Sequence, residues 1–509
     1  MKYDVIIMGG GHNSLVAATY LGKAGKKVLV LEAQAEIGGA TTSVRAFPDF
    51  DARLSRYSYL VSLLPDQIIK DLGLNFSAIS RDVSSYTPYV RNSEHRGLLV
   101  SRTWDDRSAE SFESLTGSRI EAQSWIDFYE EISRAATMIA PTLLEPLPTR
   151  AELRKRVASD HFWSSMIENP IGQIISQTFE DDIVRGVVLT DGLIGTFASA
   201  FDIQANICFL YHLIGNGTGE WKVPKGGMGA LVSELQRVAI GAGVHIQCNS
   251  EIVGIESETY GINVETVNGE KFSADFLLSN AAPSVLKKLV GEKQEPFLAG
   301  SQLKVNMLLE RLPRLKSGVD PKLAFAGTFH VNESFDQLEK AFMQARSGEL
   351  PIDAPSEMYC HTLTDPTILS PELIEKGFHT LTLFGLHTPA ELFDENNEMQ
   401  RSQALKLALT GLDNFLDEPI ESVIAKALDG SLCIEVKSPI DLESAIGLPR
   451  GNIFHKDLEF PFREEDSQPA WGVETDNPRI FTCGAGSVRG GGVSGIPGHN
   501  AAMAILSRG

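Results

Sequence analysis

The chain has 509 residues, of which 43% are hydrophobic and 22% charged, as in an ordinary soluble globular protein with more than one domain. Its formal net charge is −21 at pH 7, and so acidic a chain repels nucleic acids and anionic membrane surfaces. The five cysteines include no CxxC pair and no metal-ligand spacing, which excludes a disulfide framework, a redox-active disulfide and a cysteine metal site. We therefore expect a reduced intracellular protein without a metal centre.

The first forty residues have the order of a dinucleotide-binding unit. We expect a strand at residues 2–8, a glycine turn at 9–14 and a helix at 15–21. A second strand is expected at 27–31, followed by an acidic residue at 32. Gly9 permits the tight turn, and Gly11 lets the backbone approach a pyrophosphate at the N-terminus of the helix. Glu32 is placed to accept hydrogen bonds from ribose hydroxyls. Ser14 occupies the position of the usual third glycine and is small enough for close packing of the helix on the strand.

A glycine turn between an unrelated strand and helix is the alternative explanation of this motif. Two features argue against it. The acid Glu32 stands at the end of the second strand, and a glycine pair, Gly38 and Gly39, follows it closely. Such a pair lets a second backbone segment pass near the cofactor, which is typical of enzymes that bind FAD rather than NAD.

The middle of the chain changes from helical to strand periodicity. Residues 105–213 are mainly helical, with examples at 118–140 and at 149–157, and we expect them to form a helical lobe or cap. Thr149 and Glu152 have the spacing of a capping box. A glycine-rich stretch then precedes a helix and a series of strands, expected at 231–242, 244–248, 252–256, 261–265 and 272–281. These strands are expected to join the N-terminal sheet.

The last two fifths of the chain predict a second sheet and a return to the first. Residues 290–445 contain strand-like runs at 305–310 and 379–386, which we interpret as the sheet of a substrate lobe. A short strand at 479–483 precedes many glycines and a helix of small residues. These glycines predict a backbone that lies against a flat ligand, and a flexible tail is the alternative.

Together, the motifs resemble those of the phytoene (carotenoid) desaturase-like FAD oxidoreductases. The matching segments are residues 9–13, 32, 38–39, 224–231, 274–275, 279–281 and 490–495. Residues 55–64 and 451–455 look similar to one branch, the pyridine nucleotide-disulfide oxidoreductase domain-containing protein 2 group. The resemblance covers essentially the whole chain, and its combination of motifs is more specific than any single motif.

This resemblance implies an α/β fold. It has a Rossmann-like FAD-binding domain of the glutathione reductase/amine oxidase type and a mixed α+β substrate domain. Residues 1–75, 215–285 and 446–509 would form the discontinuous FAD domain, and residues 76–214 with 286–445 the substrate or cap domain. The implied cofactor-binding residues are Gly9, Gly11, His12, Asn13, Ser14, Glu32, Ala33, Gly38, Gly39, Ala40, Thr41, Val253, Asn280, Gly484, Gly492, Val493, Ser494 and Ile496.

The resemblance also implies how FAD would lie. Its adenine end would be near Glu32 and Val253, its pyrophosphate over Gly11, and its flavin ring near residues 492–496. Arg489 departs from the family, whose members commonly have His-Pro-Gly at this place. This arginine is either a cation that stabilises the reduced ring or a solvent-facing or packing side chain.

Flavin chemistry predicts hydride removal from a C–C or C–N bond of an apolar or moderately polar organic substrate. Candidate catalytic residues are His455, as a proton-transfer group, and Tyr57; a structural role is the alternative for each. Two other functions stay open: a flavoprotein that binds or regulates with little turnover, and a redox-neutral flavin isomerase. The chain lacks a second βαβ fingerprint, so we expect no NAD(P) domain.

The expected partner is a small organic molecule. No run of eighteen apolar residues occurs, so we expect no transmembrane helix, while peripheral membrane contact stays open. We expect a cytoplasmic location because no leader is visible, with mitochondria as the alternative that eukaryotic relatives suggest.

Overall fold

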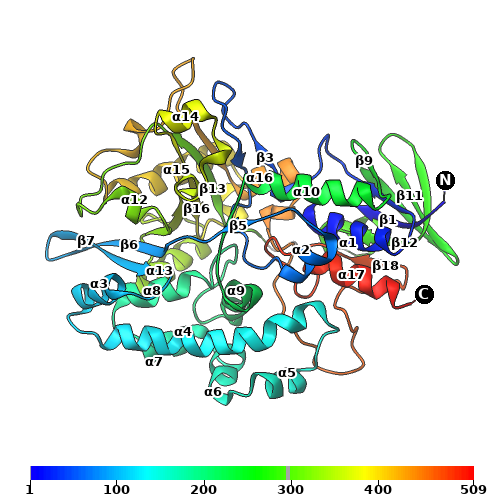
Figure 1. Ribbon diagram of the computed structural model, residues 1–509, viewed down its shortest axis with the longest axis horizontal. Helices are drawn as coiled ribbons and strands as arrows, with labels where there is room; N and C mark the ends of the chain where they lie inside the picture. The colour runs from blue at the N-terminus through cyan, green and yellow to red at the C-terminus, as the bar shows by residue number, and fades with distance from the viewer. Residues whose placement is uncertain (1, 294–298, 509) are drawn as a thin grey trace.

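The computed structural model describes residues 2–293 and 299–508, which form two sheets and a layer of helices (Figure 1). The first sheet has seven strands in the order β10-β11-β12-β1-β2-β9, with β18 beside β12. Its strands are β1 (Lys2–Met8), β2 (Val28–Leu31), β9 (His245–Gln247), β10 (Ile252–Glu258), β11 (Gly261–Thr266), β12 (Lys271–Ser279) and β18 (Ile480–Thr482). The expected return of the middle and end of the chain to the N-terminal sheet is therefore confirmed.

Strand β1 is the centre of the parallel part of this sheet. It pairs in parallel with β2 on one side and with β12 on the other, and β12 pairs in parallel with β18. Every side chain of β2 is buried, as expected of a strand covered on both faces. Because the strands run in parallel, the turns after β1, β2, β12 and β18 meet at one edge, where dinucleotides bind in this kind of sheet.

Three helices pack together beside this sheet: α1 (His12–Lys23), α10 (Met228–Gly241) and α17 (Ile496–Leu506). The sequence predicted all three, although α1 and α10 begin three residues earlier than the expected residues 15 and 231. Small residues make the packing close. A Cβ atom on Gly498 of α17 would lie only 2.0 Å from the Asn13 carbonyl oxygen of α1. Ser14 is fully buried in α1, so a small polar residue replaces the third glycine there without exposing the helix.

The second sheet also has seven strands, in the order β17-β13-β16-β15-β14-β6-β7. They are β6 (Val83–Arg91), β7 (Glu94–Ser101), β13 (Leu303–Leu309), β14 (Thr328–Val331), β15 (Ser356–Tyr359), β16 (His379–Gly385) and β17 (Ile434–Lys437). The predicted strands at 305–310 and 379–386 are confirmed as β13 and β16. The hairpin β6–β7 was not predicted, and it joins this sheet by parallel pairing of β6 with β14.

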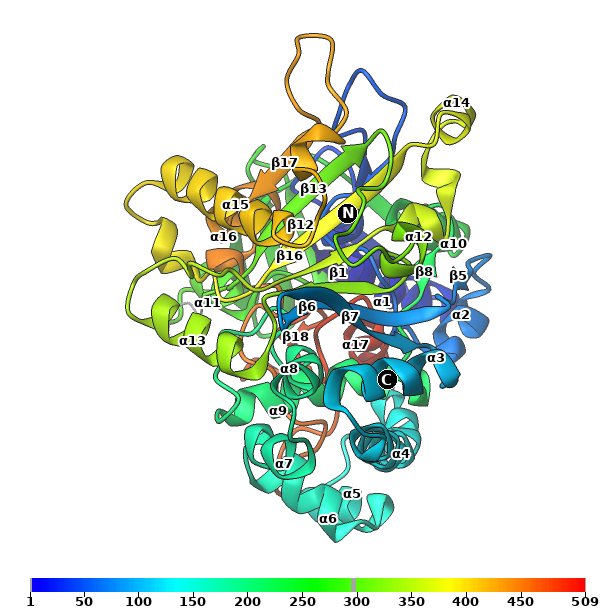
Figure 2. The same cartoon turned by 90° about the vertical axis from the view of Figure 1, so that its left-hand side faces the viewer.

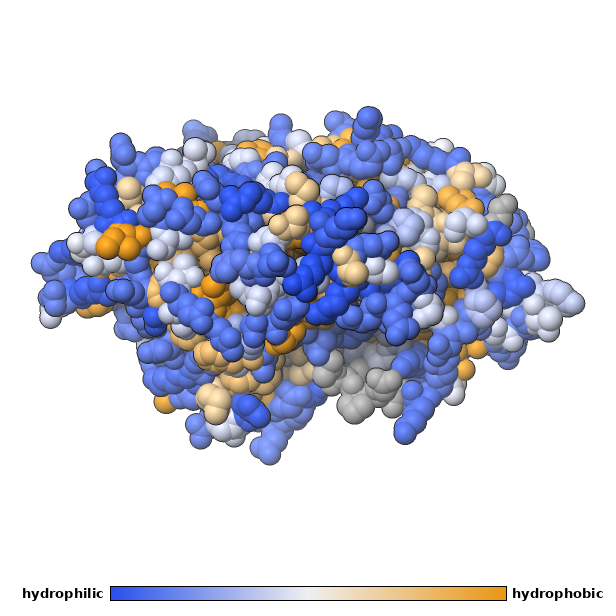
Figure 3. Space-filling model, turned by 90° about the horizontal axis from the view of Figure 1, so that it is seen from below, coloured by the Kyte–Doolittle hydropathy of each residue, from blue (hydrophilic) through white to orange (hydrophobic). Residues whose placement is uncertain are grey.

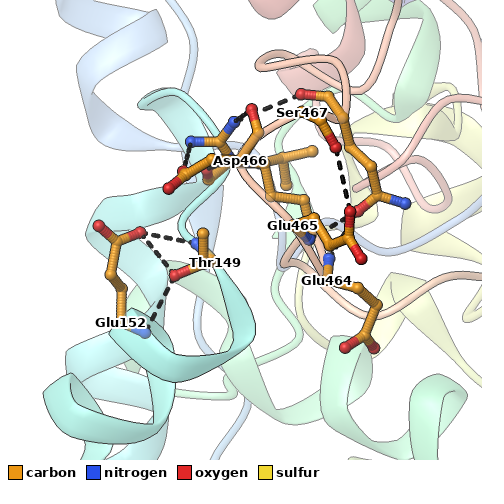
Figure 4. A network of polar contacts seen from close by, with 9 residues as sticks. Thr149, Glu152, Glu464, Glu465, Asp466 and Ser467 are labelled. Atoms are coloured by element: carbon orange, nitrogen blue, oxygen red, sulfur yellow. Dashed lines mark hydrogen bonds and ion pairs between the residues drawn. The ribbon is translucent and has the colours of Figure 1, made fainter.

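A layer of helices lies beneath the second sheet (Figure 2). It contains α3 (Asp106–Thr116), α4 (Ile120–Ile139), α5 (Arg150–Val157), α6 (Asp160–Trp163), α7 (Ile171–Thr178), α8 (Asp182–Thr190) and α9 (Ile203–Ile214). The helical prediction for this region is confirmed. The capping box of α5 is also present. The Glu152 amide donates to the Thr149 hydroxyl, and the Glu152 carboxylate accepts from the Thr149 amide (Figure 4). The loop at 463–467 reaches this helix start, where the Arg150 amide donates to the Arg463 carbonyl at 2.8 Å.

The other helices and short strands connect these layers. They are α2 (Asp66–Leu72), α11 (Pro283–Leu289), α12 (Pro321–Ala324), α13 (Phe335–Arg346), α14 (Pro371–Glu375), α15 (Asn397–Asp413), α16 (Pro439–Ile446), β3 (Ser43–Val44), β4 (Leu54–Ser55), β5 (Ala78–Ile79) and β8 (Val223–Pro224). Among the described residues, no helix is long and apolar enough to cross a membrane. Seen from below, the surface is mainly hydrophilic, with hydrophobic residues in small groups (Figure 3).

Arg489 is a packing residue that joins the helical layer to the C-terminal glycine segment. Its side chain is only 1% exposed. Its guanidinium donates hydrogen bonds to three backbone carbonyl oxygens, those of Thr142 (2.8 Å), Glu145 (2.6 Å) and Trp471 (2.8 Å). Among the roles that the sequence left open for Arg489, the structure shows that of a packing residue. The prediction of a solvent-facing side chain is wrong.

Replacing this arginine tests its packing role. Arg489→Met keeps most of the volume but removes the guanidinium donor from three carbonyl oxygens, of which that of Thr142 keeps a second donor, the Glu145 amide, so we expect a loss of about 2 kcal/mol or more in unfolding free energy. Thermal unfolding of the holoprotein measures it. Arg134→Met, on an exposed side chain of α4, is the control and should leave the unfolding midpoint unchanged. Equal midpoints for Arg489→Met and wild type would contradict the assignment.

Candidate functional site

A cavity of about 860 Å³ extends from the glycine turn after β1 to the second sheet. Ligand pockets in proteins commonly have volumes of about 300–1,000 Å³. One end is bordered by the turns of the first sheet, and the other by side chains of the helical layer and of the second sheet. The cavity therefore extends from the first sheet to the second.

The glycine turn at the first end is built around Glu32. Gly9 has a φ of +88°, which a side chain would strain. The Gly10 amide donates to one Glu32 oxygen at 2.5 Å, and the Gln34 amide donates to the other at 2.8 Å. Glu32 is 8% exposed and borders the cavity. Its carboxylate thus joins the turn after β1 to the end of β2.

The turn lets the protein backbone come close to a phosphate group of a ligand. A Cβ atom on Gly11 would lie 2.6 Å from the side-chain amide nitrogen of Asn280, so any larger residue there would displace Asn280. No side chain caps the N-terminus of α1, which starts directly after Gly11. A closely approached glycine and an uncapped helix N-terminus, whose free backbone N–H groups can donate to an anion, together fit the pyrophosphate part of a dinucleotide such as FAD.

Most of the predicted cofactor residues border this cavity, and so do both candidate catalytic residues. Those that border it are Gly9, Gly11, His12, Asn13, Glu32, Ala33, Gly39, Ala40, Asn280, Gly492, Val493, Tyr57 and His455. Those outside the lining are Ser14, Gly38, Thr41, Val253, Gly484, Ser494 and Ile496.

Several residues outside the lining support it from behind. The Gly38 amide donates to the Gly10 carbonyl at 3.0 Å, and the Thr41 hydroxyl donates to the Gly38 carbonyl at 2.5 Å. A Cβ on Gly484 would lie 2.6 Å from the Asn280 side-chain oxygen. Val253 differs, because its side chain is 49% exposed, and its strand neighbour Ile252 borders the cavity instead. Alternation along β10 turns Val253 away.

Two histidines face each other across the turn. Burial, with a contribution from His455, lowers the pKa of His12 to about 4. Burial likewise lowers the pKa of His455 to about 4. Both rings are therefore neutral at pH 7. The His455 ring borders the cavity, and its Nδ1 atom is buried without a hydrogen-bond partner in the described part of the chain.

At the second end, the wall combines aromatic and charged side chains. The Lys304 ammonium lies 4.2 Å from the centre of the Tyr59 ring, and burial lowers its pKa well below the usual range. Burial raises the pKa of Asp191 to about 8 and that of Glu357 to about 7. Arg81 also borders this end.

None of these four charged residues was predicted from the sequence to belong to the site. One signal was available: Lys304 is a charged residue in a strand, Leu303–Leu309, in which every side chain is buried. A lysine in such a strand indicates a function more often than simple packing, because burying an unpaired charge is costly. The other three lie in separate elements with no shared pattern.

Comparison with known proteins gives matches along the whole chain. The model of the flavin containing amine oxidoreductase family matches residues 15–364. An uncharacterized protein of Mycobacterium tuberculosis is 43% identical, covering 99% of this chain and 97% of its own. The mouse pyridine nucleotide-disulfide oxidoreductase domain-containing protein 2 is 28% identical, covering 99% and 93%. A structure of a putrescine oxidase mutant, 17% identical, covers both chains fully with a TM-score of 0.59.

The glycine turn provides a sharp test of cofactor binding. Gly11→Ala places a Cβ against Asn280, so we expect bound FAD to fall at least about tenfold, because the backbone can no longer approach the pyrophosphate. The FAD released from purified protein by denaturation measures it. Gly241→Ala is the matched control, since nothing lies within 4 Å of the added Cβ and the residue has no positive φ. Full FAD occupancy in Gly11→Ala would contradict the placement.

The resemblance expected from the sequence is confirmed by these matches, as are the fold class and the cofactor FAD. The glycine turn after β1 and the uncapped start of α1, at the first end of the cavity, agree with these matches. This chain belongs to the flavin-containing amine oxidoreductase family and is an FAD-dependent oxidoreductase.

Proposed function

We propose that this protein removes hydride from a C–C or C–N bond of a small organic substrate, as a dehydrogenase or desaturase does. One observation carries the proposal: the cavity that begins at the glycine turn continues to the wall of the second lobe without a break in its lining. A molecule that enters from the second end would therefore meet a cofactor held at the first end. FAD supplies the hydride acceptor.

The wall of the second end supports a substrate with an apolar body. Aromatic and aliphatic side chains of the helical layer and of the C-terminal segment border it: Trp104, Trp125, Tyr129, Ile132, Val187, Ile194, Phe454 and Leu458. Burial of apolar substrate surface against them would provide most of the binding energy.

The charged side chains at the same end argue against a pure hydrocarbon. Lys304, Arg81 and Glu357 would lose hydration to such a substrate without gaining a partner. A substrate with at least one polar group fits better. The apolar or moderately polar substrate expected from the sequence thus narrows to an amphipathic one.

His455 and Tyr57 are the proposed catalytic residues. The neutral His455 ring borders the cavity and can accept a proton. The Tyr57 hydroxyl borders the cavity, and burial raises its pKa, so it stays protonated at pH 7 and can donate a hydrogen bond. Arg56, next to it, is held by an ion pair with Glu435.

The absorbance spectrum of the holoprotein under anaerobic conditions tests the reaction class. Adding amphipathic amines, alcohols and unsaturated hydrocarbons in turn should bleach the flavin bands with one class, because hydride transfer reduces the ring. Bound flavin that no class bleaches would favour a binding or regulatory protein. Substrate conversion only after prior reduction of the flavin, without net redox change, would favour an isomerase.

The role of His455 is tested with the substrate class that bleaches. We expect His455→Gln to slow bleaching by about 10²-fold or more while FAD stays bound, as loss of a proton-transfer group does. In the wild type the rate should fall as the pH drops through about 4, where the neutral ring becomes protonated. That inflection should be missing in His455→Gln. The exposed His245→Gln is the control, and an unchanged rate in His455→Gln would contradict the role.

A further inference from the structure

A histidine and two glutamates form a cluster at the second sheet, of which only Glu357 also belongs to the charged wall of the proposed substrate end. His330 lies on β14, and Glu357 lies directly opposite it on the antiparallel strand β15. Directly opposite residues share a face, so their side chains are neighbours. After β14, Asn332 has a φ of 57°, and this left-handed turn precedes Glu333. One ligand atom from each of the three residues lies within 4.8 Å of the others.

The cluster is buried, and one of its two carboxyl groups lacks a hydrogen-bond partner among the described residues. The exposures of His330, Glu333 and Glu357 are 3%, 1% and 2%. Neither oxygen of Glu333 accepts a hydrogen bond of normal geometry in the described part of the chain. The nearby cation, Arg81, donates instead to the Thr328 hydroxyl and the Trp221 carbonyl. A buried carboxylate without a partner is strongly disfavoured, so the site calls for a bound cation or a proton.

The surrounding hydrogen bonds hold two of the three side chains, those of His330 and Glu357. The Nδ1 atom of His330 bonds the Thr87 hydroxyl at 2.9 Å, which leaves Nε2 facing Glu357 at 3.8 Å. Glu357 accepts hydrogen bonds from the hydroxyls of Thr190 (3.1 Å) and Tyr359. Metal-bound histidines and carboxylates are usually held by such outer partners.

We propose that His330, Glu333 and Glu357 bind one divalent transition-metal ion in the wall of the cavity. One imidazole nitrogen and two carboxylates suit Zn²⁺ or Mn²⁺ better than Mg²⁺ or Ca²⁺, which prefer oxygen ligands alone. His330 and Glu357 border the cavity, so water from it can complete the coordination. The ion would share Glu357 with the wall of the proposed substrate end, but it takes no part in the proposed hydride transfer.

The sequence predicts no metal centre, and the reason is geometric. The three proposed ligands come from two strands that are adjacent only in the folded sheet, and from the turn between β14 and α13. No cysteine is involved, so the spacing patterns typical of zinc sites are absent.

Metal binding to the chelator-treated holoprotein tests the proposal. Titration calorimetry with Zn²⁺ and with Mn²⁺, in a buffer containing excess Mg²⁺, should show one ion per chain. Glu333→Gln keeps the shape and removes the charge. Loss of an outer partner weakens metal binding by about 10- to 100-fold. Because Glu333 is a proposed ligand, this variant should weaken metal binding by more than that. Glu349→Gln, on an exposed residue of the same lobe, should bind as the wild type does.

A crystal soaked in Zn²⁺ then locates the ion by anomalous scattering. A peak between His330, Glu333 and Glu357 is expected. Absence of saturable binding by the wild type, equal affinity of Glu333→Gln and wild type, or a peak elsewhere would each overturn the proposal. In that case the cluster holds a shared proton or a positively charged organic group. Bound FAD, measured in parallel, shows that each variant is folded and separates this result from the test of oxidation.

Discussion

The close approach of two chain segments at the end of β1 is the constraint on which the rest of the structure depends. Gly11 and Asn280 lie so near each other that a single added carbon would touch the amide. Asn280 follows β12, and its backbone amide donates to the Met8 carbonyl at the end of β1. The third segment, at Gly484, packs against the same asparagine. Three segments that are far apart in the sequence thus share one point.

Different physical effects determine the chemistry of the two ends of the cavity. At the first end, the glycines, the uncapped helix and Glu32 present backbone donors and one carboxylate, all fixed by local geometry. At the second end, desolvation acts on long charged side chains, so that Lys304 tends to lose its proton and Asp191 and Glu357 to keep theirs. The first end is suited to a constant cofactor. The second can be tuned to a substrate by small changes of side chain.

The packing of Arg489 links these ends to the helical layer. Its guanidinium bridges Thr142 and Glu145 of that layer to Trp471, which precedes the last strand of the first sheet. The glycine segment that follows borders the cavity at Gly492 and Val493. A rigid contact therefore lies directly behind the wall where the resemblance implies the flavin ring. The expected domain boundaries, and the cytoplasmic location, stay predictions.

The sequence by itself determined the first sheet, the glycine turn after β1, the helical layer and the cofactor. These depend on local rules: glycine where φ is positive, helical spacing, alternation in strands and an acid at the end of β2. Only the tertiary structure decided which residues form the second end of the cavity. Lys304, Arg81 and Glu357 come from different elements, and Val253 turns outward because of strand alternation. The cross-strand pair of His330 and Glu357 likewise exists only through the register of β14 and β15. Contacts between distant segments follow from packing and register, which no short stretch of sequence contains.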